Sequence, residues 1–148
     1  MTRVLIADDL TGALDAGLQA YRAGLLVETV FDLRCAAPAA SRLAAGTGDA
    51  LLCVDTETRN LQPSAAYDRV REILSLLLHL GVQPAYKKVD STLRGPIAAE
   101  LSAFLEPADI RVVLVAPALP ALGRATRDGV HLVHGRMIER SEEHTSEL

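Results

Sequence analysis

Aromatic side chains are scarce in this sequence. Its 148 residues include no Trp, three Tyr and two Phe, whereas 49% of the residues are hydrophobic. A core built from this chain must therefore be aliphatic, made of Leu, Val, Ile and Ala. The length fits one domain of ordinary size, and the sequence offers no aromatic platform on which nucleic-acid bases could stack.

Positive charge is not in excess either. The formal net charge is −4 and the pI is about 5.5. Without a basic field for a phosphate backbone, we expect a small molecule rather than nucleic acid as the partner. No apolar run approaches the roughly 18 residues of a membrane span, and no basic leader precedes the apolar residues Val4 to Ile6. We therefore expect no membrane association and a cytoplasmic location.

Cysteines and several familiar motifs are rare or missing. We interpret Cys35 and Cys53 as reduced packing residues rather than as a disulfide or a metal pair. The sequence lacks G-x-x-x-x-G-K-[ST], it lacks G-x-G-x-x-G after its first apolar run, and it lacks G-x-S-x-G. His131 and His134 have no acidic or thiolate partners close by, so we predict no metal site.

Short apolar runs alternate with helical patterns along the chain. Helices are predicted over Ala13 to Ala23, from Pro63 to Gly81 and from Pro96 to about Leu105, because apolar residues recur there at helical spacing. This alternation favours a three-layer αβα fold, Rossmann-like, with a mostly parallel sheet. The predicted strands are Val4 to Ala7, Leu26 to Phe31, Ala50 to Val54, Ala85 to Val89 and Arg111 to Ala116.

The remaining segments are less regular. We expect a loose helix around Pro38 to Leu43, a long loop over Pro117 to Gly129, and a possible last strand over Val130 to Val133. The last nine residues, Arg140 to Leu148, resemble a translated sequencing-library adapter. Removal of its one Arg and three Glu would change the formal charge from −4 to −2. We therefore predict a domain over 1–139 and a disordered tail over 140–148, with a natural short charged tail as the alternative.

Polar clusters follow four of the predicted strands. They are Asp8 to Gly12, Asp55 to Arg59, Asp90 to Gly95, and the pair Gly123 and Arg124. Ligands of open α/β sheets bind outside the carboxyl ends of the strands. If the sheet is parallel, all four clusters face one cleft, and this shared placement indicates a binding site.

The segment from Lys87 to Pro96 is the most informative cluster. Lys87 and Lys88 should point to opposite faces of their strand, so that one of them reaches the cleft. The following turn offers hydroxyl groups, the Arg94 guanidinium and the N–H groups of a helix start, which together suit a carboxylate or a phosphate. The alternative is that Ser91 or Asp90 merely caps the turn while the basic side chains are solvated.

The acidic residues allow two interpretations as well. Asp8 or Asp9 could accept the proton of a substrate hydroxyl, or one of them could cap the helix that follows. Asp55 and Arg59 could bind the hydroxyls and the carboxylate of a substrate, or they could pair with each other at the surface.

The clusters resemble the four-carbon acid sugar kinase family. The matching blocks are Ile6 to Ala13, Asp55 to Arg59, Tyr86 to Gly95, Ala116 to Pro120 and Gly123 to Thr126, in the order of that family. The resemblance extends from residue 5 to about 135. Leu122 and Pro96 depart from the family's usual residues.

This resemblance implies an ATP-dependent kinase, using Mg²⁺, that phosphorylates erythronate, threonate or oxo-tetronates. In such a two-domain enzyme this chain would be the sugar-acid-binding half, with most of the nucleotide site on a second domain, so the chain alone should be inactive. A homo-oligomer is possible. A non-catalytic sugar-acid-binding module is one rival; the other is an aspartate-dependent phosphatase, although its second acid should stand two residues after the nucleophile.

We assign roles to the candidate residues on the basis of this resemblance. Asp9 would accept the hydroxyl proton, while Arg94, Lys88 and Arg59 would bind the carboxylate or the transferring phosphate. Asp8, Asp55, Asp90 and Ser91 would orient these groups. The other predicted substrate-binding residues are Thr11, Lys87 and Gly95, and Gly12, Gly123 and Arg124 form a supporting group.

Overall fold

Four parallel strands form the main sheet of the computed structural model, which describes residues 1–108, 110 and 112–140. They are β1 (Thr2–Ala7), β2 (Leu26–Val30), β3 (Ala50–Asp55) and β4 (Gln83–Lys88), in the spatial order β2-β3-β1-β4. Ala7 at the end of β1 lies opposite Asp55 of β3 and Lys88 of β4. The carboxyl ends of these three strands are therefore level with one another.

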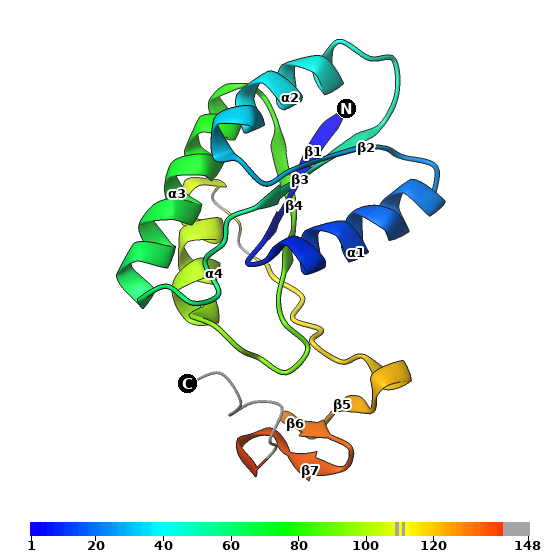
Figure 1. Ribbon diagram of the computed structural model, residues 1–148, viewed down its shortest axis with the longest axis vertical. Coiled ribbons are helices and arrows are strands. Elements are labelled where there is room, and N and C mark those ends of the chain that lie inside the picture. Colours follow the sequence, from blue (N-terminus) through cyan, green and yellow to red (C-terminus); the bar gives the residue numbers. More distant parts are fainter. Residues whose placement is uncertain (109, 111, 141–148) are drawn as a thin grey trace.

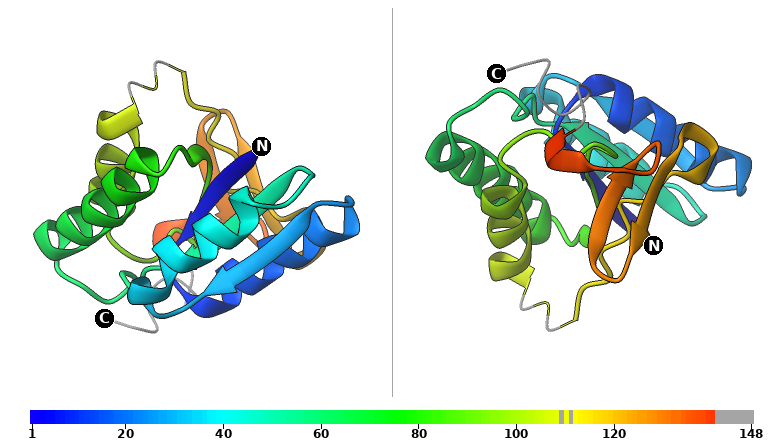
Figure 2. Two further views of the ribbon diagram at one scale, coloured as in Figure 1. Left: turned by 90° about the horizontal axis from the view of Figure 1, so that it is seen from above. Right: turned by 90° about the horizontal axis from the view of Figure 1, so that it is seen from below.

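Helices cover both faces of this sheet. Helix α1 (Leu10–Arg22) lies on one face, and α2 (Ala36–Ala44), α3 (Pro63–His79) and α4 (Ile97–Leu105) lie on the other (Figures 1 and 2). Successive strand residues supply the two cores: Leu5 and Cys53 pack toward α1, whereas Ile6 and Val54 belong to the larger cluster on the α2 to α4 face. The predicted three-layer α/β fold with a parallel sheet is confirmed.

Helix ends agree with the local sequence signals. Asp9 is the N-cap of α1, where its side chain accepts a hydrogen bond from Gly12 N, and Gly24 follows the helix with a φ of +91°. Pro63 opens α3, and Gly81 follows it with a φ of +78°. Pro96 is the N-cap residue of α4, so the helix begins one residue later than the predicted start at Pro96.

A small antiparallel sheet follows the main sheet in sequence. It consists of β5 (Arg124–Arg127), β6 (Val130–Val133) and β7 (Arg136–Met137). The predicted strand over Val130 to Val133 is confirmed, whereas part of the predicted Pro117 to Gly129 loop forms β5. Figure 1 shows this sheet beyond the end of the main sheet at which β1 runs into α1. His131 of β6 connects the two, since its Nε2 lies 2.8 Å from the carbonyl oxygen of Ser91.

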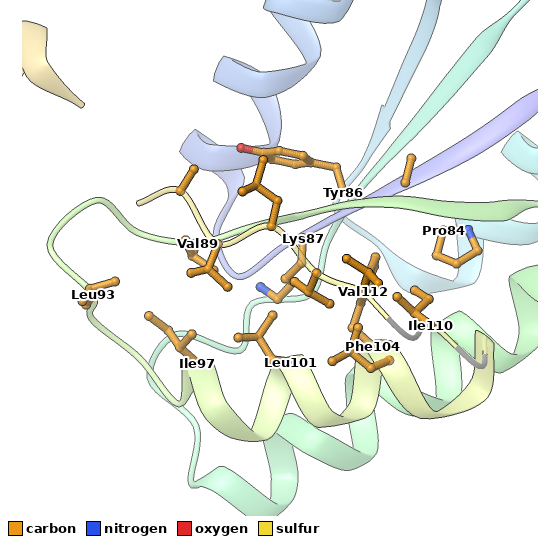
Figure 3. A pocket seen from close by; sticks show the side chains of 16 residues that line it. Pro84, Tyr86, Lys87, Val89, Leu93, Ile97, Leu101, Phe104, Ile110 and Val112 are labelled. Atoms are coloured by element: carbon orange, nitrogen blue, oxygen red, sulfur yellow. The ribbon is translucent and has the colours of Figure 1, made fainter. Parts of the chain in front are cut away.

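The predicted strand over Arg111 to Ala116 is wrong for residues 112–116, and Arg111 lies outside the described residues. Residues 112–116 form no strand, and no described strand pairs with β4 on the side away from β1. A cavity of about 540 Å³ lies between this segment, β4 and α4 (Figure 3). Val112 and Leu114 are 86% and 92% exposed. The β-branched run favours an extended chain, but a strand also needs a partner about 4.8 Å away.

Candidate functional site

A cleft of about 1050 Å³ lies at the carboxyl ends of the main strands. Its walls combine the start of α1, the loops after β3 and β4, and the segment that leads into β5. All four predicted polar clusters contribute to it: three follow β1, β3 and β4, as expected for a parallel sheet, whereas Arg124 belongs to β5 of the antiparallel sheet, because the predicted fifth strand does not form over residues 112–116. The predicted site residues that line it are Asp9, Thr11, Gly12, Arg59, Lys88, Asp90, Ser91, Arg94 and Arg124.

Arg59 joins three carboxylates at the floor of the cleft. Its Nε donates to Asp8 Oδ2 at 2.8 Å, and its Nη1 donates to Asp9 Oδ2 at 2.8 Å. Its Nη2 lies 3.7 Å from Asp90 Oδ1. Burial disfavours the charged guanidinium, but the bond to Asp8 and the charges of the three carboxylates outweigh it, so the pKa of Arg59 is raised. Arg59 therefore holds together loops that follow three different strands.

Asp90 and Arg94 form a second charged pair. Arg94 donates to the Asp90 carboxylate through Nε at 2.8 Å and through Nη2 at 3.1 Å, and Thr92 donates through its N–H and its hydroxyl. Burial alone would raise the pKa of Asp90, but these hydrogen bonds and the nearby Arg59 charge hold it well below its usual value. Asp90 thus caps its turn, as the simpler interpretation proposed, and also fixes Arg94 beside the cleft.

Asp9 combines the capping role with a position at the cleft. Its Oδ1 accepts from Gly12 N at 2.9 Å, its Oδ2 accepts from Arg59, and its side chain remains 25% exposed. A carboxylate offers about four acceptor positions, so these two bonds leave Asp9 able to accept from a ligand hydroxyl. The space beside it depends on Gly12, because a Cβ there would lie 2.6 Å from Asp9 Oδ1 and 3.2 Å from Lys88 Cγ.

Asp8 lies beneath the cleft rather than on its wall. It is 1% exposed, and its carbonyl oxygen accepts from the N–H groups of Thr58 and Arg59. Its Oδ2 accepts from Arg59, and Oδ1 is buried without a hydrogen-bond partner among the described residues. These contacts anchor the loop that carries Arg59.

The two adjacent lysines lie on opposite faces of β4. Lys88 lines the cleft, and its Nζ donates to the Val89 carbonyl oxygen at 2.7 Å. Lys87 points between β4 and α4 (Figure 3), where its Nζ lies 3.0 Å from Glu100 Oε2. The structure thus brings Lys88 into the group of cleft residues and leaves Lys87 outside it.

Three other predicted residues support the cleft without lining it. Asp55 is 2% exposed, accepts from Glu57 N at 2.9 Å, and has a pKa that is raised by burial. Gly95 has a φ of +91°, and a Cβ there would lie 3.2 Å from the carbonyl oxygen of Arg59. Gly123 has a φ of +71° and faces the His134 ring, 2.4 Å from the position of a Cβ.

Sequence reasoning missed a set of buried polar residues behind the cleft. Thr56, Thr58 and Glu100 are each at most 1% exposed. Glu100 was detectable, because it shares the apolar face of α4 with Ile97 and Phe104 at helical spacing. A charged residue at such a position needs a buried partner.

Strained backbone occurs in both loops that carry the charged cluster. Glu57, after β3, has a φ of 49°, and Leu93, after β4, has a φ of 55°. Non-glycine residues in this region cost roughly 1–3 kcal/mol and persist where surrounding contacts determine the backbone. The hydrogen bonds of Asp55 and Asp90 to these loops supply such contacts.

Other kinds of site find little support in the described part of the chain. No helix there combines the length and the apolar character needed to cross a membrane. No group of three or more His, Cys, Asp or Glu in the described ranges is placed to hold a metal ion. Cys35 and Cys53 are both free thiols, and burial raises the pKa of Cys53 to about 11.

The fold and the cleft define an α/β domain whose cleft is lined by arginine, lysine and aspartate side chains. Comparison with known families is more specific. Residues 3–147 match the sugar-binding N-terminal domain. The chain belongs to this family, and its curated relatives include four-carbon acid sugar kinases, as the sequence motifs predicted.

Several relatives are close enough for direct comparison. The D-threonate kinase of Cupriavidus necator is 39% identical over 145 residues, which are 96% of this chain and 32% of that protein. The D-threonate kinase of Salmonella typhimurium is 35% identical over 136 residues, or 91% of this chain and 30% of that protein. The D-erythronate kinase of Heliobacterium modesticaldum is 35% identical over 144 residues, or 94% and 31%. The chain spans about a third of the length of these relatives.

A solved structure is similar over the same region. The crystal structure of a domain of unknown function from Bordetella bronchiseptica, a domain-swapped dimer with bound citrate, superimposes with a TM-score of 0.85 at 35% identity. The match covers 96% of this chain and 35% of that one.

Proposed function

We propose that this chain is the sugar-acid-binding part of an ATP-dependent kinase that phosphorylates four-carbon acids such as threonate or erythronate. The observation that carries the proposal is the convergence of four loops on one cleft, with Asp9, Lys88 and Arg94 on its walls. A four-carbon acid has a carboxylate for the basic groups and hydroxyls for the acidic one. The kinase relatives and the citrate bound by the solved relative support a small hydroxy acid as the ligand.

In this proposal the side chains of the cleft have different roles. Lys88 and Arg94 bind the substrate carboxylate or the transferring phosphoryl group, and Asp9 accepts the proton of the attacking hydroxyl. Arg59 is already engaged with Asp8, Asp9 and Asp90, so its main task is to fix the loops. Phosphoryl transfer depends on positioning and charge stabilisation more than on covalent help from the protein.

ATP with Mg²⁺ is the phosphoryl donor that the kinase relatives imply. The cleft residues fit an anion. Because the chain spans about a third of the length of the kinase relatives and matches a sugar-binding N-terminal domain, we propose that most of the nucleotide site lies on the two thirds of the kinase that this chain does not span. We also propose a cytoplasmic enzyme, and a homo-oligomer because the solved relative is a domain-swapped dimer.

Thermal melting of the 148-residue chain against a set of acids tests this proposal. The set comprises D-threonate, D-erythronate, oxo-tetronates and, separately, ATP with Mg²⁺. A ligand at about 100 times its Kd adds roughly 2.7 kcal/mol of stability, which raises Tm measurably. We expect one four-carbon acid to raise Tm and ATP to have no effect.

Matched variants connect any response to the cleft. Arg94→Ala should weaken binding at least tenfold, about 1.4 kcal/mol, whereas Arg34→Ala, at a side chain that is 90% exposed, should leave binding unchanged. Stabilisation by ATP alone would contradict the proposal that this chain binds the acid while the rest of the kinase carries most of the nucleotide site. Acid binding that survives Arg94→Ala would contradict the proposed anion site.

A further inference from the structure

A chain of four buried polar side chains lies behind the cleft, on the α4 side of the sheet. We call Thr56, Thr58, Glu100 and Lys87 the buried polar chain. The first three are at most 1% exposed, and the Lys87 side chain is 3% exposed. None of them lines the cleft, and Figure 3 shows Lys87 between β4 and α4.

Close polar contacts connect the four side chains in series: hydrogen bonds at Thr56 and Thr58, a contact between the two hydroxyl oxygens, and the ion pair of Glu100 with Lys87. The Thr56 hydroxyl donates to the Ala7 carbonyl oxygen at 2.8 Å, and it lies 2.8 Å from the Thr58 hydroxyl. The Thr58 hydroxyl donates to Glu100 Oε1, and Glu100 Oε2 lies 3.0 Å from Lys87 Nζ. The series therefore runs from the end of β1, through the loop after β3 and a residue of α4, to the end of β4.

Three points of attachment, at Ala7, Thr58 and Lys87, lie within two residues of a cleft residue. Ala7 precedes Asp8 and Asp9, and Thr58 precedes Arg59. At the other end, Lys87 Nζ also donates to the Lys88 carbonyl oxygen at 2.9 Å, which fixes the backbone of a cleft residue directly. A substitution that breaks a contact within the buried polar chain would therefore change the distances between Asp9, Arg59 and Lys88.

The free energy of unfolding alone does not explain why an ion pair and two hydroxyl groups are buried here. Desolvation of two buried charges offsets much of their attraction, so that well-packed apolar residues of similar size often give equal or greater stability. In some proteins a buried ion pair instead specifies a single geometry through its hydrogen bonds.

We propose that the buried polar chain is a positioning network for the cleft, with Lys87, Glu100 and Thr58 as positioning residues that bind no ligand themselves. It sets the distances between Asp9 after β1, Arg59 after β3 and Lys88 at the end of β4. These distances in turn determine the affinity for the acid. The proposal rests on the proposed function for its ligand, the four-carbon acid that gives the largest rise in Tm.

The decisive variant replaces the ion pair by apolar residues, Lys87→Met together with Glu100→Leu. Its unfolding midpoint in urea should equal or exceed that of the unaltered chain, while calorimetry should show a Kd for the acid at least tenfold weaker. The control is Arg42→Gln together with Glu28→Gln, which removes an ion pair whose side chains are 60% and 29% exposed. The control should leave Kd unchanged.

Substitutions of Thr58 test the same network without altering its charges. Thr58→Val removes the hydroxyl at nearly constant volume and should weaken binding, whereas Thr58→Ser keeps the hydroxyl and should restore most of the affinity. This pair decides the question if the double variant does not fold. A Kd for Thr58→Val within twofold of that of the unaltered chain overturns the proposal if the double variant does not fold. If the double variant folds, a Kd within twofold in both variants overturns it.

Amide hydrogen exchange provides a readout that needs no ligand. The N–H groups of Thr58 and Arg59 both donate to the Asp8 carbonyl oxygen, so the double variant should exchange them faster while β3 stays protected. If the unaltered chain binds none of the acids, the proposed function is wrong, and exchange alone then decides about positioning. Unchanged exchange of these two amides would overturn the network.

Discussion

Single residues determine whether the charged side chains of the cleft can take up their positions beside one another. Gly12 lies inside α1, where alanine normally stabilises a helix by roughly 0.5–1 kcal/mol relative to glycine. Here a Cβ would lie 2.6 Å from Asp9 Oδ1 and 3.2 Å from Lys88 Cγ. A methyl group at this position therefore has to displace the carboxylate that caps the helix or the lysine that reaches the cleft.

We accordingly expect Gly12→Ala to separate binding from helix stability. Affinity for the four-carbon acid should fall about tenfold, about 1.4 kcal/mol, while the unfolding free energy falls by much less than a lost core contact would cause. Calorimetry and urea unfolding measure the two quantities. Gly48→Ala is the matched control, because a Cβ there meets nothing within 4 Å. Full affinity in Gly12→Ala would show that binding does not depend on the present positions of Asp9 and Lys88.

The pH dependence of stability should report on Asp90. Its pKa lies below the unfolded value of about 3.9, so its stabilising contribution is present above about pH 4 and is lost as the pH falls toward the folded pKa. Asp55, whose pKa is raised, contributes with the opposite sign and loses its contribution as the pH rises through its folded pKa.

Asp90→Asn should therefore destabilise the chain by about 2 kcal/mol at neutral pH, the usual size of a lost hydrogen bond to a charged group. The difference from the unaltered chain should narrow below about pH 4. Urea unfolding at a series of pH values measures this, with the exposed Asp68→Asn as the control. A difference that stays constant down to low pH would refute the charged role of Asp90.

At the scale of elements, the sequence predicted the four strands of the main sheet and β6, but it placed β5 in a loop and predicted a strand over residues 112–116, which form none. The predicted strands agree with β1 to β4 to within two residues. In β1 and β3 a continuous apolar run lies between two helical layers, whereas β4 carries polar residues and is mostly exposed or half-buried. Residues 112–116 are as apolar as the runs of β1 and β3, but pairing depends on an approach to β4 that local sequence does not encode. The preference of a segment for an extended backbone is a local property, whereas the formation of a strand depends on tertiary contacts with a partner strand.

Whether residues 112–116 pack as a strand can be tested with Leu114→Lys. Because Leu114 is 92% exposed, the substitution should change the unfolding free energy by no more than about 0.5 kcal/mol. Leu52→Ala, at a fully buried position of β3, should cost about 2–5 kcal/mol in the same urea experiment. A loss of about 2 kcal/mol or more in Leu114→Lys would mean that residues 112–116 pack as the predicted strand.

At the scale of the whole molecule, the cleft depends on two sheets that the sequence could not place relative to each other. The position of four polar clusters after strands predicted a common cleft, because a parallel sheet brings those ends together. It could not predict that Asp8 and Asp55 would be buried or that Arg59 would join three carboxylates. Those outcomes depend on side-chain contacts between loops that are far apart in sequence.

The small sheet is connected to the cleft through His131. Because the Ser91 carbonyl oxygen can only accept, the 2.8 Å contact requires a proton on Nε2 of His131, while Nδ1 lies 3.1 Å from the Thr126 hydroxyl. His131 is 6% exposed, and β5 carries Arg124 to the cleft wall. The hydrogen bond thus joins the loop after β4 to the strand pair that supplies Arg124.

His131→Ala should therefore loosen the small sheet without unfolding the main one. We expect faster amide exchange in β5 and β6, unchanged protection in β1 and β3, and an affinity for the acid that falls about fivefold, the effect of one lost hydrogen bond of about 1 kcal/mol. His79→Ala, at an exposed position near the end of α3, is the control and should change neither quantity. If β1 and β6 instead lost protection together, the two sheets would form one cooperative unit, and His131 would contribute to the stability of the whole domain.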